Sequence, residues 1–303
     1  VFKLGVTGYV LATILSDLLS ALFLFTIANL RRYIRFFGCD WSVAASMVRY
    51  ALPLIPTNIF WWITNASDAF FIAYYLGQGA NGLLTVAYKV PTIINLLAGI
   101  FSDAWQLSAF TEDQQGRTRF FSNVFASYQA LIFTSASGLI LLCKWINRIL
   151  AYGEYYESWR FIPVLLLATS FSCLVSFLGT IYMLEKKSFA TLVTTALGAG
   201  INIILNMTLI PNFGVQGGVV ATLAGYLVVF TVRIIDTRRI VPLHWHPFKL
   251  LLNLALLGVQ TYILLTFETG WLLPEIGLCL VVTALNYRLL LQNVQRLLMR
   301  RRS

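Results

Sequence analysis

Long apolar runs dominate this sequence and restrict what the chain can fold into. About nine stretches approach the ~20 residues that a helix needs to cross the hydrocarbon core of a bilayer, and short polar connections separate them. Charged residues make up only 11% of the chain and hydrophobic residues 58%. A soluble domain carries about 25% charged residues, so this chain lacks the side chains that a water-facing surface needs. The sequence therefore predicts an all-α, polytopic helical membrane protein with about nine transmembrane helices.

The expected helices begin and end where apolar runs meet polar, glycine-rich or proline-containing segments. They cover residues 5–30, 51–75, 83–110, 120–142, 161–183, 189–210, 217–235, 249–267 and 272–291. We expect a tight turn at 78–82, QGANG, to join the second helix to the third. The first run starts almost at Val1, without an initiator methionine, so we expect a fragment whose N-terminal part is missing.

The basic residues favour one set of connections between the apolar runs. The chain carries 22 Lys and Arg against 12 Asp and Glu. Most of the basic residues lie in alternate connections, from residues 31–49 to the C-terminal segment 288–302. An excess of Lys and Arg marks cytoplasmic loops, so we expect Val1 outside and the C-terminus in the cytoplasm. Basic patches interleaved with exposed aromatic residues are not found, so nucleic acid is not an expected partner.

Motifs of catalysis and metal binding are missing from the sequence. The four cysteines lie far apart without metal-ligand spacing. His244 and His246 flank Trp245 in a segment without further ligands. No Ser/His/Asp set, phosphate-binding glycine loop or zinc-ligand set is present. The sequence predicts neither an enzyme nor a bound metal or cofactor.

Polar side chains instead form a stripe on each of two neighbouring expected helices. Steps of three and four residues place them on one helical face. The stripe of helix 51–75 contains Asn58, Trp61 or Trp62, Asn65 and Asp68, and that of helix 83–110 contains Lys89, Thr92, Asp103 and Gln106. Such residues are costly in hydrocarbon and usually face the bundle interior or a water-filled cavity. Interhelical hydrogen bonding explains Asn58, Asn65 and Thr92 equally well.

Asp68 and Lys89 are expected at the same depth in the membrane. Each lies six or seven residues from the connection between the two helices, which is roughly 10 Å at ~1.5 Å rise per residue. An antiparallel hairpin would bring the two side chains level. We predict that Asp68 and Lys89 form a pair, or compete for one substrate, in a polar cavity that opens to the outside.

Several segments in combination resemble a family of membrane transporters. They lie within residues 45–240 and include RYALPLIPTNIFWWITNASDAFFIAYYLG, AYKVPTIINL, GEYYESWRFIPVLLL and TTALGAGINIILNMTLIPNFGVQGGVVAT. These segments are similar to the polysaccharide flippases. This family comprises the Wzx-type O-antigen and capsule exporters and lipopolysaccharide biosynthesis proteins of the multidrug/oligosaccharidyl-lipid/polysaccharide (MOP, MATE-like) superfamily.

The resemblance implies a fold of two six-helix lobes around a central cavity, with two extra C-terminal helices in many members. Residues 1–32 would then be the last helix of a truncated N-terminal lobe. Residues 33–240 would form the six-helix C-terminal lobe. Residues 241–303 would add two helices and a basic cytoplasmic tail. The hairpin 51–110 would line the central cavity.

The resemblance also implies a function. The protein would translocate an undecaprenyl-pyrophosphate-linked oligosaccharide across the bacterial cytoplasmic (inner) membrane for polysaccharide or lipopolysaccharide biosynthesis. Membrane lipids and a glycan polymerase or glycosyltransferases are the other expected partners. The candidate substrate-binding residues are Lys89, Asp68, Asn65, Asn58, Asp103 and Trp61.

Two alternatives remain open at this point. A MATE-type drug/cation antiporter would need an acidic cavity, and Lys89 argues against one. A non-transporting scaffold for the glycan polymerisation machinery would tolerate apolar residues throughout both stripes.

Overall fold

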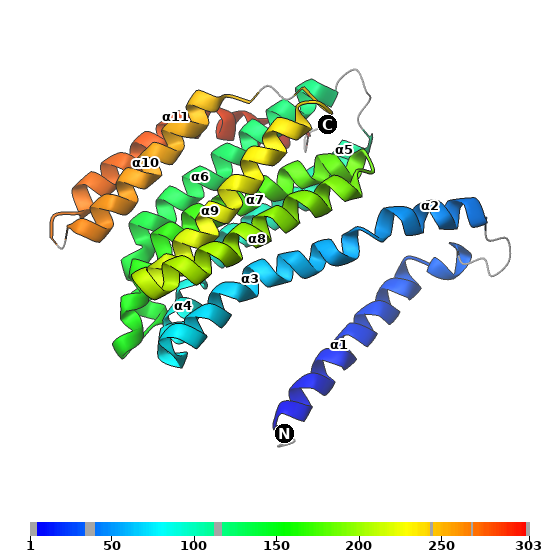
Figure 1. Cartoon of the computed structure of the whole chain (residues 1–303). Coiled ribbons are helices and arrows are strands. Elements are labelled where there is room, and N and C mark those ends of the chain that lie inside the picture. The colour runs from blue at the N-terminus through cyan, green and yellow to red at the C-terminus, as the bar shows by residue number, and fades with distance from the viewer. Residues whose placement is uncertain (1–4, 34–39, 112–116, 243–244, 268, 301–303) are drawn as a thin grey trace. The chain divides into compact units, whose positions relative to one another are not determined.

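The computed structural model describes residues 5–33, 40–111, 117–242, 245–267 and 269–300 (Figure 1). Every regular element within these ranges is a helix. This confirms the all-α fold expected from the apolar runs. The connection 112–116, His244 and the end of the expected basic tail, 301–303, lie outside the described residues.

The chain divides into two compact units, residues 1–49 and 50–303. The first unit contains α1 (Gly5–Ile27), the 3-10 turn η1 (Leu30–Tyr33) and most of α2 (Trp41–Ala51). The large apolar side chains along α1 are exposed, as expected of a helix whose surface faces lipid or another helix. Before α2, the exposed Asp40 carboxylate accepts hydrogen bonds from the backbone N–H and the hydroxyl of Ser42, at 2.9 and 2.7 Å. These bonds cap the helix and hold the pKa of the Asp40 carboxyl below its usual value.

The second unit is a bundle built around one central helix, α7 (Ile162–Leu184). Helices α5, α6, α8 and α9 all pack against α7, α3 packs against α8 and α9, and α10 and α11 pack against α6. The bounds are α3 (Leu54–Leu76), α4 (Gln78–Ala87), α5 (Pro91–Thr111), α6 (Arg117–Leu150), η2 (Gly153–Arg160), α8 (Ser188–Phe213), α9 (Val215–Thr237), α10 (Pro247–Thr266) and α11 (Leu272–Arg300).

Aromatic rings fill the contact between α7 and its neighbours. The ring of Phe177 stacks on Trp105 with 4.4 Å between centroids, and lies 5.2 and 5.5 Å from the rings of Phe125 and Tyr128. All four side chains are buried. In a bilayer, close packing of this kind takes over from the hydrophobic effect in holding helices together.

A helix is found at each of the nine expected positions, but the number of spans is not fully confirmed. Within the described residues, six single helices are long and apolar enough to cross a membrane, and α4 with α5 adds a seventh as a bent pair. Helix α3 has 23 residues, yet it falls outside this set because its stripe of Asn and Asp lowers its hydropathy. The apolar part of α11, Leu272–Tyr287, is shorter than the others.

The turn expected at 78–82 is wrong, since these residues form the beginning of α4. Gly77 alone separates α3 from α4. Its φ of +87° lies in the region that glycine adopts without steric cost, so one residue suffices for the turn.

The single helix expected over residues 83–110 is also wrong. The chain leaves the helix at 88–90 and α5 begins at Pro91, with a bend of 43° between the two parts. Proline lacks a backbone N–H and its ring disfavours a helical conformation in the preceding residue. The sequence VPT therefore ends one helix and starts the next.

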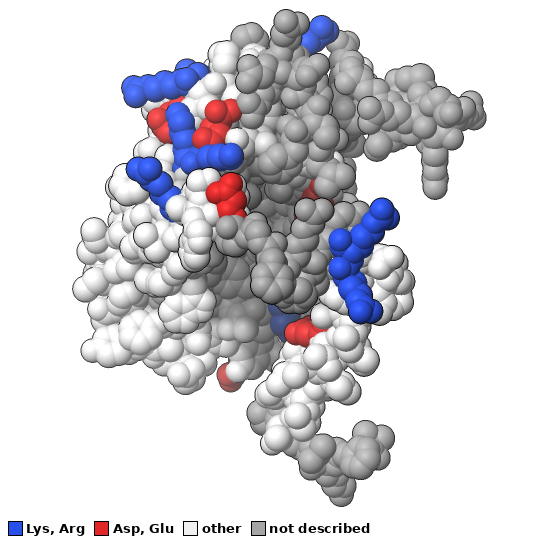
Figure 2. Space-filling model, turned by 90° about the vertical axis from the view of Figure 1, so that its right-hand side faces the viewer, with Lys and Arg blue, Asp and Glu red and all other residues white. Residues whose placement is uncertain are grey.

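Charged side chains gather in patches at one end of the bundle. Figure 2 faces the right-hand side of Figure 1, where α7 and α9 end and α8 begins. At the upper left of Figure 2, Lys and Arg lie beside acidic residues, and most of the other residues drawn in colour are white. The connections at this end carry Lys186, Lys187, Arg238 and Arg239. Apolar flanks with charged ends are the pattern expected of a membrane-spanning bundle.

The close approach of α8 to α9 gives a stability prediction. A Cβ at Gly217 would overlap the backbone of Leu209, whereas a Cβ at Gly200 would meet no atom within 4 Å. We expect Gly217→Ala to lower the free energy of unfolding by about 1–3 kcal/mol, because the two helices must move apart. Gly200→Ala is the matched control within α8 and should leave stability equal or slightly higher. Thermal unfolding of the detergent-purified protein measures both, and equal midpoints would contradict the prediction.

Candidate functional site

A carboxylate lies at the centre of a buried polar cluster in the second unit. Asp68, on α3, has no exposed surface. Its Oδ1 accepts hydrogen bonds from the amides of Asn206, at 2.7 Å, and Asn202, at 3.3 Å. Its Oδ2 accepts from the hydroxyl of Tyr88, at 2.9 Å, and from the hydroxyl of Thr222. Four neutral donors from three other segments thus surround one acid, and such donors are what a buried carboxylate requires.

Further bonds tie the cluster together across helices. The hydroxyl of Ser67 donates to Asn202 Oδ1 at 2.5 Å, and Asn202 Nδ2 lies 3.1 Å from Thr222 Oγ1. Asn202 and Asn206 are four residues apart on α8, so both face α3. The sequence analysis missed all four partners of Asp68, which are Asn202, Asn206, Thr222 and Tyr88. Two asparagines at helical spacing inside the apolar run NIILN were the available signal.

A cavity of about 140 Å³ lies in front of this cluster. Helices α3, α5, α7 and α9 and the break before α5 contribute its lining, whose polar members are Asn65, Tyr88, Thr92, Asn95, Thr169, Ser172, Thr222 and Tyr226. Tyr88 and Thr222 both line the cavity and bond to Asp68, so a single layer of hydroxyl groups separates the cavity from the carboxylate. At ~30 Å³ per water, the space suits a few waters or part of a small polar molecule, and not a whole oligosaccharide.

The structure brings some of the predicted residues to this cavity and leaves others on the surface. Asn65 lines it and accepts a hydrogen bond from Tyr226 at 3.3 Å. The ring of Trp61 lies 5.9 Å from that of Tyr226. Asn58, Lys89 and Asp103 are exposed and do not line this cavity.

The predicted ion pair between Asp68 and Lys89 is wrong. Among the residues that the structure describes, no ion pair joins them: Asp68 is enclosed and Lys89 is exposed. Tyr88, the residue before Lys89, bonds to the carboxylate instead. Tyr88 and Lys89 lie where the chain leaves the helix, so they no longer follow the helical periodicity on which the predicted pair was based. That Lys89 contacts a substrate stays a prediction.

The atoms of the cluster can also be compared with those of a metal site. Within the described ranges, no three His, Cys, Asp or Glu side chains gather into a metal site. The oxygen atoms of Asp68, Asn202, Asn206 and Thr222 belong to the ligand class of hard cations. Both carboxylate oxygens are taken up by neutral donors here, so in this structure the cluster links helices.

Removing the acceptor at the centre of the cluster should destabilise the bundle. We expect Asp68→Ala to lower the free energy of unfolding by about 3 kcal/mol, because several buried donors lose their partner at once. Asp103→Ala removes an exposed acid on a neighbouring helix and should change stability by less than about 0.5 kcal/mol. Thermal unfolding in detergent compares the two. A loss for Asp68→Ala no larger than that of the control would contradict the role of the cluster.

Comparison with known proteins places the chain in a family. A family model described as polysaccharide biosynthesis protein matches residues 1–158 of the 303. No curated protein matches the sequence. A solved structure described as lipid II flippase MurJ, inward closed conformation, superposes with a TM-score of 0.61 and 18% sequence identity, covering 90% of this chain and 60% of that one. The chain thus spans less than two thirds of the length of that protein. The two findings confirm the family and the flippase-like fold that the sequence resemblance implied: the chain belongs to the polysaccharide biosynthesis protein family and has a MurJ-like fold.

Proposed function

We propose that this chain is part of a flippase that moves an undecaprenyl-pyrophosphate-linked oligosaccharide from the cytoplasmic to the outer leaflet of a bacterial inner membrane. Membership of a polysaccharide biosynthesis family supports a glycan substrate. The multi-pass helical bundle supports a membrane location. A polar headgroup crosses hydrocarbon slowly by itself because its hydration is lost. Its transfer between leaflets therefore needs a polar path through a protein, and no covalent bond has to be made or broken.

The observation that carries the proposal is the neutral polar cavity at the face of α3, α5, α7 and α9. Its amide and hydroxyl groups can donate to and accept from sugar hydroxyls. No Asp, Glu, Lys or Arg is among its described lining residues, so it suits an uncharged sugar ring better than an ion. The cavity is too small for the whole substrate, and a second lobe facing it would supply the remaining contacts.

The broken helix beside the cavity supports the same assignment. Transporters commonly build their substrate sites on discontinuous helices, whose unwound residues and helix ends face the substrate. Here the unwound residues are 88–90, and Tyr88 lines the cavity. Lys89 is adjacent and exposed, so its ammonium group is available to a pyrophosphate. In this proposal, Lys89 binds the pyrophosphate of the headgroup. Asn65 and Trp61 contact a sugar ring. Asn58 and Asp103 lie on the outer surface of the path.

The proposed architecture follows the sequence resemblance. Residues 1–32 end an N-terminal lobe, 33–240 form the C-terminal lobe, and 241–303 add two helices and a tail with its end in the cytoplasm. Rocking of the two lobes would alternate access to the cavity. A glycan polymerase or glycosyltransferases would act on the same lipid-linked oligosaccharide before or after its transfer.

The headgroup assignment predicts a charge requirement at residue 89. In a host carrying the altered chromosomal gene, we expect Lys89→Ala to lower surface polysaccharide roughly tenfold or more, since one charge-assisted bond to phosphate is lost. Lys89→Arg should retain most of the export. Lys187→Ala, an exposed lysine between α7 and α8, is the control and should export normally. Immunodetection of surface glycan and mass spectrometry of inner-leaflet lipid-linked oligosaccharide measure the result. Normal export by Lys89→Ala would contradict the assignment.

The cavity itself predicts a second effect. We expect Asn65→Leu combined with Asn95→Leu to reduce export strongly while the protein stays folded, because apolar side chains cannot bond to sugar hydroxyls. Asn212→Leu is the matched control, since Asn212 is exposed and bonds only within α8. A scaffold would tolerate the double substitution. A drug/cation antiporter would instead change drug resistance with glycan export intact, and either outcome would replace the proposed function.

A further inference from the structure

A second and larger groove lies at the end of the bundle opposite Lys186 and Arg238. Its volume is about 900 Å³. The end of α6, the 3-10 segment η2 and the start of α7 form one wall, and the end of α10 with Trp271 before α11 forms the other. The cavity of the proposed transport path has no lining residue in common with it.

The groove is lined by cations and aromatic rings. Its charged lining residues are Lys144, Arg148 and Arg160, and no Asp or Glu is among the described residues that line it. The Lys144 ammonium lies 4.3 Å from the ring centroid of Trp159 and 4.5 Å from that of Trp271. Glu157 pairs with Arg160 beside the groove, and Glu275 lies near enough to Lys144 to interact with it electrostatically. Arg148 is the lining cation for which no acidic partner is found among the described residues.

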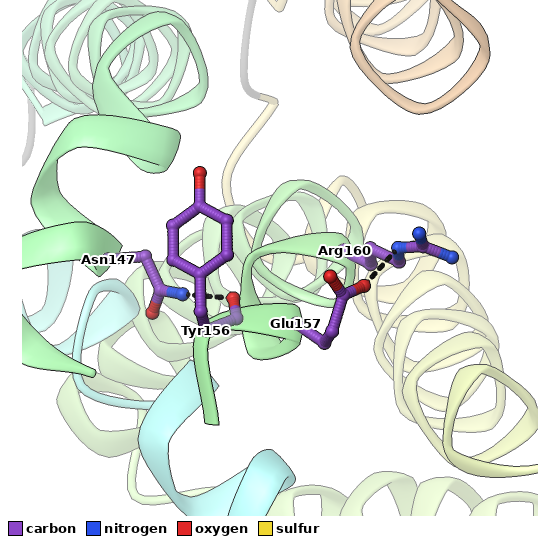
Figure 3. Close-up of polar contacts among 4 residues, drawn as sticks. All are labelled: Asn147, Tyr156, Glu157 and Arg160. Atoms are coloured by element: carbon purple, nitrogen blue, oxygen red, sulfur yellow. Dashed lines mark hydrogen bonds and ion pairs between the residues drawn. The ribbon is translucent and has the colours of Figure 1, made fainter. Parts of the chain in front are cut away.

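The wall formed by η2 is held in place by buried bonds. Asn147 is fully buried, and its Nδ2 donates to the backbone carbonyl of Tyr156 at 2.6 Å (Figure 3). Its Oδ1 accepts from the Ser158 hydroxyl at 3.0 Å. Arg160 forms an ion pair with Glu157 at 2.7 Å, and both side chains are more than half exposed. In Figure 3 the Tyr156 ring points away from the bond that its carbonyl makes. These bonds hold the backbone of η2, which carries Trp159 and Arg160 into the groove wall.

We propose that this groove binds the phosphate of an anionic membrane glycerophospholipid. Arginine and lysine side chains are the usual partners of phosphate oxygens. Tryptophan and tyrosine gather at the level of lipid headgroups, where one end of the ring is apolar and the other is wet. Both kinds of residue meet here at the ends of spanning helices. The site goes beyond the proposed transport function, because it is a place for a resident lipid and not for the transported one.

The apolar part of the lining favours a lipid over free phosphate. Phe161, Leu264, Leu265 and Phe267 share the groove with the cations. Inorganic phosphate would leave these side chains in water, whereas the glycerol and upper acyl chain of a lipid would cover them. The groove lies between the α6–α7 side of the bundle and the helix pair α10–α11, so a bound lipid would link the two parts.

Lipid retention in nanodiscs tests the proposal. The full chain is reconstituted in phosphatidylcholine containing a small fraction of phosphatidylglycerol, and native mass spectrometry counts the phosphatidylglycerol that stays bound. We expect the double variant Arg148→Gln with Arg160→Gln to retain it roughly tenfold less than the unaltered chain. The matched control is Arg238→Gln with Arg239→Gln at the other end, where Arg238 lies 4.6 Å from the Trp245 ring. The control should retain the lipid.

Two further measurements make the result decisive. Arg148→Gln alone removes a side chain with no described polar contact, so this variant should fold normally. A partial loss of bound phosphatidylglycerol from it would show that misfolding does not explain the loss in the double variant. A phosphatidylglycerol with a photoreactive headgroup should label peptides from residues 144–161 or 264–271. Equal retention of phosphatidylcholine, equal loss in the control, or displacement of the lipid by excess inorganic phosphate would overturn the proposal.

Discussion

A buried carboxylate in a membrane bundle must find donors within the protein, and Asp68 shows how strongly this requirement shapes the fold. Its four donors come from α8, α9 and the break before α5. In hydrocarbon an unpaired carboxylate costs several kcal/mol, so these segments must all be in place together. The register of α3 against α8 and α9 is thereby specified by polar groups, whereas apolar packing alone tolerates many registers.

The cavity depends on the same cluster. Tyr88, where the chain unwinds at 88–90, donates its hydroxyl to Asp68 and also lines the cavity between α3, α5, α7 and α9. Thr222 has the same double role on α9. A change of the Asp68 cluster would therefore move two groups that line the cavity. Under the proposed function, this gives Asp68 an indirect route to the groups that meet the substrate.

The sequence alone predicted the all-helical fold and most of the helix positions, because apolar length and helical periodicity carry that information. It placed Asn58, Asn65 and Asp68 on one polar face of α3, of which Asp68 is buried and Asn58 and Asn65 are exposed. It failed at Asp68, whose partners Asn202 and Asn206 lie 134 and 138 residues away. Periodicity shows which face of a helix is polar, but not which neighbour it meets. It failed again at Lys89, since the break at Pro91 rotates the chain away from the periodicity assumed for one continuous helix.

Other buried charges in the described bundle follow the rule seen at Asp68. Arg233, on α9, donates to the hydroxyls of Thr194 and Thr195 and to the backbone carbonyl of Val175. Glu275, on α11, accepts from Gln260 of α10, which in turn accepts from Ser137 of α6. Neutral groups of α7 and α8 thus bind Arg233, and one neutral amide links Glu275 to the hydroxyl of a third helix. Such links join helices in the same way as the Asp68 cluster, whereas Lys89 and Arg148, the cations assigned to ligands above, are exposed.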